Sequence, residues 1–397
     1  MTALAYLQSQ RERMIETACR WSSRNSGSRN RVGLADLGEM ILDAFVDFLD
    51  PDTAETRWLE ATADPGVPLL VLQKRPAAPC RVFLFGHLDT VFGPEHPFQT
   101  VTPLGGDRIR GPGLCDMKGG LVIMLHGLAA YERFVEPKRV GWTVAINADE
   151  EIGSPASSGE LVQAARNHHF AFGFEPALAS GALASQRRGS GTFLLRFHGR
   201  AAHSGRNPRD GRNALVPLAR FVLHCEELNA GRDTIFLNPA EVTGGVATNM
   251  VPDLATCRIN VRTSSAEDER WVHDALHAFI ASIHNTSDYR VELEGRFTAP
   301  PKAATPETLK LIELARQAGH DLGVEIGAEP TGGTCDGNRL AAAGIPNLDN
   351  LGVRGGNLHS AEEFIYASSL PERAQLLFTM LRRINEAADT AGKAATA

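Results

Sequence analysis

The chain has 397 residues, of which 43% are hydrophobic and 22% charged, and its formal net charge is −7. These values are typical of a globular protein, and a chain of this length usually forms two domains. The net negative charge and the absence of lysine or arginine blocks argue against a nucleic-acid partner, and no apolar stretch is long enough to cross a membrane. The polar N-terminus and six scattered cysteines favour a reducing, cytoplasmic location without a disulfide framework.

Helical and strand-like patterns alternate over the first 186 residues. Apolar residues between positions 34 and 48 keep helical spacing on one face. Residues 69–72, 82–85 and 142–146 are predicted strands, and residues 117–130 are a predicted helix. This alternation is typical of an α/β fold with a mostly parallel sheet covered by helices.

The pattern changes between residues 187 and 297, which we predict to be an inserted domain. Strands and helices there indicate the strand-helix-strand-strand-helix-strand order of a small α+β sandwich. The strands are predicted at 192–197, 254–261 and 289–293, and the helices at 213–227 and 266–284. The alternating pattern then returns, with a helix at 306–322, a strand at 345–348 and a helix at 370–387. Residues 298–397 are therefore predicted to complete the domain begun by residues 1–186.

The predicted strand at residues 82–85 stops at Gly86 and is followed by His87 and Asp89. Four bulky apolar residues in a row indicate a buried central strand. Residues two apart in an extended chain point to the same side, so His87 and Asp89 can meet. A carboxylate that holds one imidazole nitrogen leaves the other free to bind a metal. Ordinary turn chemistry explains such a pair equally well.

Acidic residues also follow a glycine-proline turn and another predicted strand. Asp116 comes after Gly111-Pro112-Gly113, where it fits either a helix N-cap or a rigid carboxylate able to bridge two cations. The strand at 142–147 leads into Asp149-Glu150-Glu151, three acids that repel one another unless a positive charge lies nearby. Neighbouring side chains point in different directions, so one glutamate can bind a metal while the other holds a water, as metal-assisted hydrolysis requires. A solvated turn is the alternative.

Two single residues join this group. Glu175 ends a strand-like run, where a buried acid is costly without a partner, and His359 follows a glycine-rich loop, where it alone suggests a surface histidine. In open α/β sheets, ligands gather at the edge where the strands end. Two imidazoles and three carboxylates suit a pair of zinc or related divalent ions, and Glu150 can take a proton from an acidified water. The five candidate ligands are His87, Asp116, Glu151, Glu175 and His359.

These segments together resemble a known family. Gly86 to Val91, Gly111 to Gly120, Asp149 to Ser154, Glu175-Pro176 and His359-Ser360 are similar in order and spacing to the motifs of the M20 family of co-catalytic zinc aminoacylases and carboxypeptidases. Within that family the chain is most similar to the carboxypeptidase G2-like glutamate carboxypeptidases. The resemblance implies a zinc-exopeptidase-like catalytic domain and an inserted lid that forms homodimers.

The resemblance also implies a role for each residue. His87 and Glu175 would hold one divalent ion, most often Zn²⁺ with Co²⁺ or Mn²⁺ as alternatives. Glu151 and His359 would hold the second ion, and Asp116 would bridge the two. Asp89 would orient His87, and Glu150 would be the general base and then the general acid.

The inserted domain carries further signals of the same family. Gly199 to Gly205 resembles the motif whose histidine, here His203, reaches a neighbouring subunit's active site and stabilises the oxyanion; a dimer-contact histidine is the alternative. Asn249 matches a substrate-contacting asparagine. Arg262 and Arg296 match positions that bind substrate carboxylates, with surface or dimer ion pairs as the alternative. Cys335 departs from the usual small or acidic residue of the glycine loop in which it lies.

We therefore predict a metallo-carboxypeptidase that hydrolyses the amide bond between an acyl or peptidyl group and a C-terminal amino acid. Glutamate fits if Arg296 binds its α-carboxylate. The alternatives are an N-acyl-amino-acid deacylase of the acetylornithine or succinyl-diaminopimelate type and a non-catalytic metal-binding scaffold, against which the presence of Glu150 argues. The expected substrate is a small N-acyl amino acid or peptide.

Overall fold

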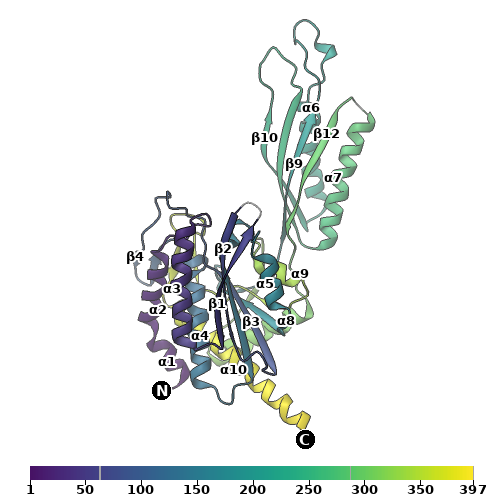
Figure 1. Cartoon of the computed structure of the whole chain (residues 1–397). Coiled ribbons are helices and arrows are strands. Elements are labelled where there is room, and N and C mark those ends of the chain that lie inside the picture. The colour runs from purple at the N-terminus through teal and green to yellow at the C-terminus, as the bar shows by residue number, and fades with distance from the viewer. Residues whose placement is uncertain (62–63, 287, 397) are drawn as a thin grey trace. The chain divides into compact units, whose positions relative to one another are not determined.

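A computed structural model describes residues 1–61, 64–286 and 288–396 of the chain. The chain forms two compact units. The first comprises residues 1–185, 304–331 and 335–397, and the second comprises residues 186–303 and 332–334. Figure 1 labels their helices and strands. No helix in the described part of the chain is both long and apolar enough to cross a bilayer.

The first unit is built on a six-stranded sheet in the order β1-β2-β6-β3-β7-β14. Its members are β1 (Thr53–Ala61), β2 (Asp64–Lys74), β3 (Cys80–His87), β6 (Val140–Asn147), β7 (Phe170–Gly173) and β14 (Asn347–Leu348). Strands β6, β3, β7 and β14 are mutually parallel, and β2 pairs antiparallel with β6 and β1. The carboxyl ends of four parallel strands therefore lie along one edge of the sheet.

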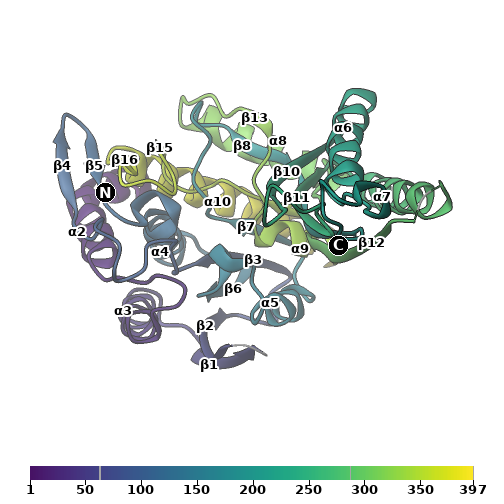
Figure 2. The ribbon, with the colours of Figure 1, turned by 90° about the horizontal axis from the view of Figure 1, so that it is seen from above.

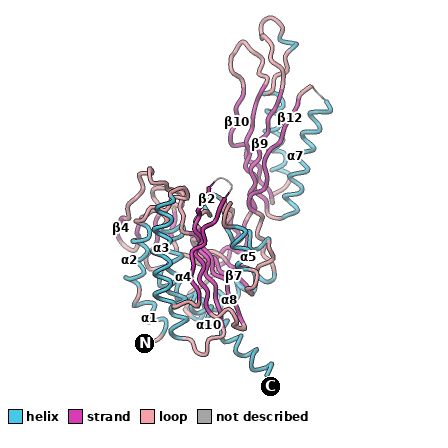
Figure 3. Tube along the Cα trace, in the orientation of Figure 1, coloured by secondary structure: helices cyan, strands magenta, loops and turns pink. Residues whose placement is uncertain are grey.

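Helices cover both faces of this sheet, which explains the unbroken apolar runs of its strands. In β3, Val82 and Leu84 belong to one hydrophobic cluster, whereas Phe83 and Phe85 belong to another. Figure 2 shows the sheet between α3 and α4 on one side and α5 and α9 on the other, and Figure 3 shows it between α4 and α5. The helices of this unit are α1 (Ala3–Ser9), α2 (Arg11–Ser22), α3 (Arg31–Leu49), α4 (Gly119–Phe134), α5 (Ser158–Ala165), α8 (Pro306–Asp321), α9 (Asp336–Ala342) and α10 (Ser369–Thr396).

A smaller sheet in the order β15-β16-β5-β4 brings two distant parts of the chain together. In β16, Phe364 pairs with Arg110 of β5, and in β15, Gly355 pairs with Ile365 of β16. This sheet ties the segment after His359 to the segment before Asp116. Its strands are β4 (Thr102–Gly105), β5 (Arg108–Arg110), β15 (Gly355–Gly356) and β16 (Phe364–Tyr366), and a separate two-stranded sheet joins β8 (Leu183–Arg187) to β13 (Ala328–Thr331).

The second unit is an antiparallel sheet in the order β10-β11-β9-β12 with two helices. Alternate residues of the strands pack with both helices in one core, including Leu195, Ile259, Phe221 and Leu276. The chain order is the strand-helix-strand-strand-helix-strand pattern expected from the sequence. The elements are β9 (Gly189–His198), α6 (Leu215–Gly231), β10 (Ile235–Gly244), β11 (Leu254–Thr263), α7 (Ala266–Thr286) and β12 (Arg290–Ala299).

Two predicted boundaries differ from those of the structure. The predicted helix at residues 117–130 begins later, at Gly119, because Asp116 and Met117 have non-helical backbone angles. The expected domain boundary after residue 297 falls inside β12, whose pairing with β9 continues to Ala299 opposite Ser190. The compact unit accordingly extends to residue 303.

Candidate metal centre

His87 is the last residue of β3, and its side chain is almost fully buried. Its Nε2 atom lies 3.2 Å from Oδ1 of Asp116 and 3.8 Å from Oε1 of Glu175. On the other side of the ring, Nδ1 lies 3.1 Å from the backbone oxygen of Asp89 and 3.3 Å from its carboxylate. The ring is thus held through Nδ1, and Nε2 faces two carboxylates.

Asp89 is fully buried and accepts several hydrogen bonds in addition to its contact with His87. The backbone N–H groups of Glu150 and Glu151 each donate to its carboxylate at 3.2 Å, and the Ser28 hydroxyl donates at 2.7 Å. One carboxylate therefore fixes both the imidazole at the end of β3 and the turn after β6.

Asp116 does not cap α4, because the residue at that cap is Lys118. Asp116 instead lies in a wide helical turn, Leu114–Lys118, before the helix begins. Its Oδ1 atom is 3.2 Å from Nε2 of His87, and its Oδ2 atom is 3.5 Å from Nε2 of His359. The two oxygens of one carboxylate face two different imidazoles, which is the geometry of a bridging ligand.

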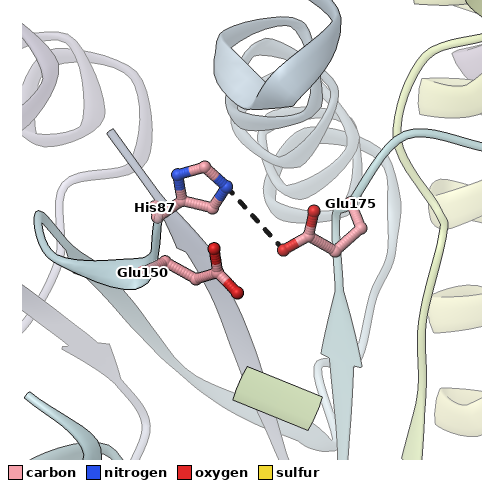
Figure 4. Close-up of side chains that lie close together, drawn as sticks. All are labelled: His87, Glu150 and Glu175. Atoms are coloured by element: carbon pink, nitrogen blue, oxygen red, sulfur yellow. Dashed lines mark ion pairs between the residues drawn. The ribbon is translucent and has the colours of Figure 1, made fainter. Parts of the chain in front are cut away.

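The two glutamates after β6 lie in a short 3₁₀ turn, Glu150–Ile152, and face different partners. Oε2 of Glu151 is 3.1 Å from Nε2 of His359. Glu150 joins His87 and Glu175 in a group whose ligand atoms lie within 4.8 Å of one another, shown in Figure 4. His87, Asp116 and Glu151 form a second such group. The neighbouring glutamates thus belong to different groups, and His87 is common to both.

Glu175 and His359 are held by segments that run side by side. The backbone N–H of Gly352 donates to the Glu175 oxygen, and the N–H of Ala177 donates to the Val353 oxygen, both at 2.9 Å. The Glu175 side chain is 12% exposed, whereas that of His359 is 56% exposed. Although exposed, His359 reaches two carboxylates of the cluster.

The excess of carboxylates sets the electrostatics of this cluster. Burial acts to lower the pKa of His87, but its hydrogen bonds to Asp116 and Asp89 dominate and raise this pKa well above its usual value. Hydrogen bonds to Asp116 and Glu151 raise the pKa of His359 to about 10. Burial, followed by the charge of Glu175, raises the pKa of Glu150 well above its usual value. The cluster strongly favours positive charge at its centre.

The donor set fits a pair of divalent cations. Two imidazole nitrogens and carboxylates from Asp116, Glu150, Glu151 and Glu175 converge at the carboxyl edge of the sheet. Nitrogen and oxygen donors without thiolates suit zinc and related ions. The Nδ1 contacts between His87 and Asp89 are of the kind that orients an imidazole when it binds a metal.

The remaining predicted residues belong to the second unit. His203 and Asn249 are exposed and lie on adjacent segments, since the N–H of Ser204 donates to the Asn249 oxygen at 3.0 Å. Arg262 of β11 donates from Nε to Oδ1 of Asn260 at 3.0 Å, and burial lowers its pKa. Arg296 of β12 is exposed and lies opposite Thr192.

Two buried acidic residues near the cluster, Glu363 and Asp336, were not singled out from the sequence. Glu363 accepts hydrogen bonds from the loop that carries Asp116. Asp336 accepts from Ser154 and from Nδ2 of Asn147, beneath the turn that carries the glutamates. Cys335, which departs from the family pattern, donates its thiol to Oδ2 of Asp349 at 2.6 Å. In this sequence Glu363 lies four residues after His359, and this closeness to a candidate ligand is the signal that could have pointed to it.

The family model "Peptidase family M20/M25/M40" matches residues 83–383, which include all five predicted ligands. The chain belongs to this family. It is 29% identical over 300 residues to carboxypeptidase G2 of Pseudomonas sp., covering 74% of this chain and 71% of that protein. It is 25% identical over 325 residues to succinyl-diaminopimelate desuccinylase of Maricaulis maris, covering 76% of this chain and 80% of that protein.

Solved structures share the M20 fold. A tripeptidase from Staphylococcus aureus superposes with a TM-score of 0.79 at 19% identity, over 95% of this chain and 99% of that one. The Bacillus subtilis protein YXEP, described as a dinuclear metal-binding M20 peptidase, superposes with a TM-score of 0.70 at 14% identity, over 96% and 99%. This M20 chain is a hydrolase, and the prediction of an M20 metallopeptidase with an α/β fold is confirmed.

Proposed function

We propose that this M20 enzyme is a carboxypeptidase that hydrolyses the amide bond between an acyl or peptidyl group and a C-terminal amino acid. The observation that carries the proposal is the position of the Asp116 carboxylate, one oxygen toward His87 and the other toward His359. Such a bridge between two imidazole-bearing positions supports a two-metal hydrolytic centre. The similarity to carboxypeptidase G2 supports the substrate class.

Each side chain has an assigned task in this proposal. His87 and Glu175 would hold one cation, Glu151 and His359 would hold the other, and Asp116 would bridge them. Bound cations would polarise the scissile carbonyl and lower the pKa of water at the site. Glu150 would accept a proton from the attacking water at its carboxylate and deliver it to the leaving amine as the amide bond breaks. Asp89 keeps Nε2 of His87 directed at the centre.

The second unit supplies the proposed substrate contacts. Arg262 and Arg296 bind substrate carboxylates, for which a planar guanidinium offers a two-pronged grip. Asn249 contacts the substrate, and His203 of a neighbouring copy donates a hydrogen bond to the developing oxyanion. This arrangement requires a homodimer formed through the inserted domain. We further propose that the metal is zinc and that the enzyme acts in the cytoplasm.

A second candidate activity is removal of an N-acyl group such as succinyl from an amino acid. The similarity to succinyl-diaminopimelate desuccinylase over 80% of that protein favours it. The two activities share the metal centre and differ in which side of the scissile bond is recognised. In the carboxypeptidase, the C-terminal amino acid and its α-carboxylate determine binding, whereas in the deacylase the acyl group does.

A two-way substrate panel tests the proposal. The purified, Zn²⁺-loaded enzyme is assayed with one aromatic acyl group on several amino acids, glutamate among them, and with several acyl groups on glutamate. The carboxypeptidase proposal expects kcat/KM to vary mainly with the amino acid and to fall when Arg296 is changed to Gln. Variation mainly with the acyl group, with succinyl preferred, would establish the second activity instead.

Metal dependence is tested separately by chelation. Dialysis against a strong chelator should abolish hydrolysis, and stepwise Zn²⁺, Co²⁺ or Mn²⁺ should restore it up to two equivalents per chain. Full activity after complete metal removal would refute the two-metal proposal.

A further inference from the structure

Glu363 is a buried carboxylate that holds the loop carrying Asp116. Its residue is 1% exposed. Its Oε2 atom accepts the N–H of Gly113 at 3.0 Å, and its Oε1 atom accepts the N–H groups of Cys115 and Asp116 at 2.8 and 3.0 Å. The Glu363 side chain thus accepts three backbone N–H groups of one loop, one of them that of Asp116 itself. These hydrogen bonds fix the path of the loop backbone.

Local sequence cannot supply this support to the loop. Asp116 and Met117 have non-helical backbone angles, and the hydrogen bonds of this wide turn run from the N–H groups of Lys118 and Gly119. They do not use the N–H groups of Gly113, Cys115 and Asp116. An unpaired buried N–H costs about 1–3 kcal/mol, which makes an outside acceptor necessary for each of the three groups. The side chain of Lys118 is also buried and interacts electrostatically with Glu363.

Glu363 also stands four residues after His359, in the segment that leads into β16. Its own backbone oxygen accepts the N–H of Gly111 at 3.2 Å. The next residue, Phe364, pairs with Arg110 of β5. Backbone and side chain of Glu363 therefore fasten the Asp116 loop to the segment that carries His359.

We propose that Glu363 is a positioning residue that sets the Asp116 carboxylate between His87 and His359 and so determines how tightly the metal pair is held. The inference rests on the proposed function, because it takes Asp116 as the bridging ligand. Glu363 touches neither substrate nor metal in this proposal. Its effect passes through the backbone of residues 113–116.

The amide variant tests this role with little change in volume. Both oxygens of Glu363 accept N–H groups, so in Glu363→Gln the amide NH₂ faces at least one N–H donor whichever way it is turned. Outer contacts of this kind change metal affinity by about 10–100-fold when they are lost. Glu363→Asp keeps the carboxylate but is one methylene shorter. Its Co²⁺ affinity should therefore lie between those of Glu363→Gln and the wild type.

The experiment is a Co²⁺ titration of the whole chain in its metal-free form. Binding is monitored by calorimetry and by the visible absorption of bound Co²⁺. Glu362→Gln is the matched control, since Glu362 is an exposed neighbour that pairs with Arg110. Asp116→Asn is the reference for loss of the bridge. We expect Glu363→Gln to weaken at least one Co²⁺ equivalent by about 10–100-fold and to alter the absorption spectrum, while Glu362→Gln matches the wild type.

The outcomes separate the two proposals. If Asp116→Asn loses Co²⁺ but Glu363→Gln binds it with wild-type affinity and spectrum, the positioning role is wrong and the metal centre stands. A lower melting temperature of Glu363→Gln with unchanged Co²⁺ affinity refutes the role equally, because it shows a purely structural contribution. If Asp116→Asn itself binds Co²⁺ like the wild type, the proposed centre fails. Should Glu363→Gln not fold, Glu363→Asp decides by the same criteria.

Discussion

The carboxylate of Asp89 accepts a hydrogen bond from the backbone N–H of Glu150 at 3.2 Å. The same carboxylate lies 3.3 Å from Nδ1 of His87. A residue expected to orient one metal-binding imidazole therefore also fixes the turn that presents the proposed base. The positions of base and ligand are set by a single buried group.

This double role predicts that Asp89→Asn disturbs both the orientation of the His87 ring and the position of the Glu150 turn. The N–H of Glu151 and the Ser28 hydroxyl also donate to this carboxylate, so the new amide NH₂ must face a donor. We expect kcat/KM and metal affinity both to fall by about 10–100-fold. Ser28→Ala is the control, since it removes one donor and leaves the contacts to His87 and Glu150. Loss of metal affinity without loss of kcat in the metal-saturated variant would show that Asp89 does not position Glu150.

Substitution of the two adjacent glutamates should separate proton transfer from metal binding. Glu150→Gln removes the proposed base, and kcat should fall by about 10²–10⁴-fold while two metal equivalents remain bound. Glu151→Gln removes a proposed ligand beside His359, so the bound metal measured by elemental analysis should fall toward one equivalent per chain. Undiminished hydrolysis by Glu150→Gln would refute its assignment as the base.

The clustering of the candidate site residues at one edge of the sheet was predictable because most of them follow buried strands. His87 ends β3, Glu150 and Glu151 follow β6, and Glu175 follows β7. The apolar runs of these strands carry a strong local signal, and parallel strand ends must meet at one edge. The expectation that the two adjacent glutamates differ in role came from their neighbouring positions, and the motif resemblance implies the same assignment of Glu150 as base and Glu151 as ligand.

Elements with weaker local signals were missed. β10 is an edge strand in which Ile235 and Leu237 are buried but most later residues are exposed, and a bulge follows Pro239. Such a strand lacks regular alternation, and an internal proline argues against it in sequence.

Glu363 was missed for a different reason. Its partners lie about 250 positions earlier in the chain, and only the folded structure brings them together.

The close packing of α4 against the backbone of Phe174 predicts that one added methyl group at Gly120 lowers stability strongly. A Cβ atom at Gly120 of α4 would lie 2.1 Å from the backbone oxygen of Phe174, the residue before Glu175. Because backbone must move to relieve this contact, Gly120→Ala should destabilise the protein by about 1–3 kcal/mol and displace Glu175. Weaker metal binding should accompany the loss of stability, measured by urea unfolding and Zn²⁺ titration.

Gly159 of α5 provides the matched control, because no atom lies within 4 Å of a Cβ built there. Gly159→Ala should stabilise the protein by about 0.5–1 kcal/mol through helix propensity alone. If Gly120→Ala were equally stabilising, the close approach of α4 to Phe174 would not exist in solution.

His126 of α4 predicts a pH dependence of stability that is separate from the metal centre. The ring is fully buried against Phe48, and within the described chain neither ring nitrogen has a hydrogen-bond partner. Burial, aided by the charge of Arg13, lowers its pKa to about 4. The unfolded chain therefore binds more protons than the folded one between about pH 4 and 6.5, so stability falls as the pH falls through this window.

The variant His126→Leu isolates this contribution. Linkage gives a loss of roughly 2 kcal/mol between pH 7 and pH 5 for the wild type, and the variant should lack this part of the loss. At pH 7 the variant should be at least as stable, because it removes buried polar atoms without partners. Urea unfolding of both proteins at the two pH values, in metal-free buffer, measures the difference. Equal losses in the two proteins would mean that His126 finds a hydrogen-bond partner or reaches solvent, contrary to its packing against Phe48.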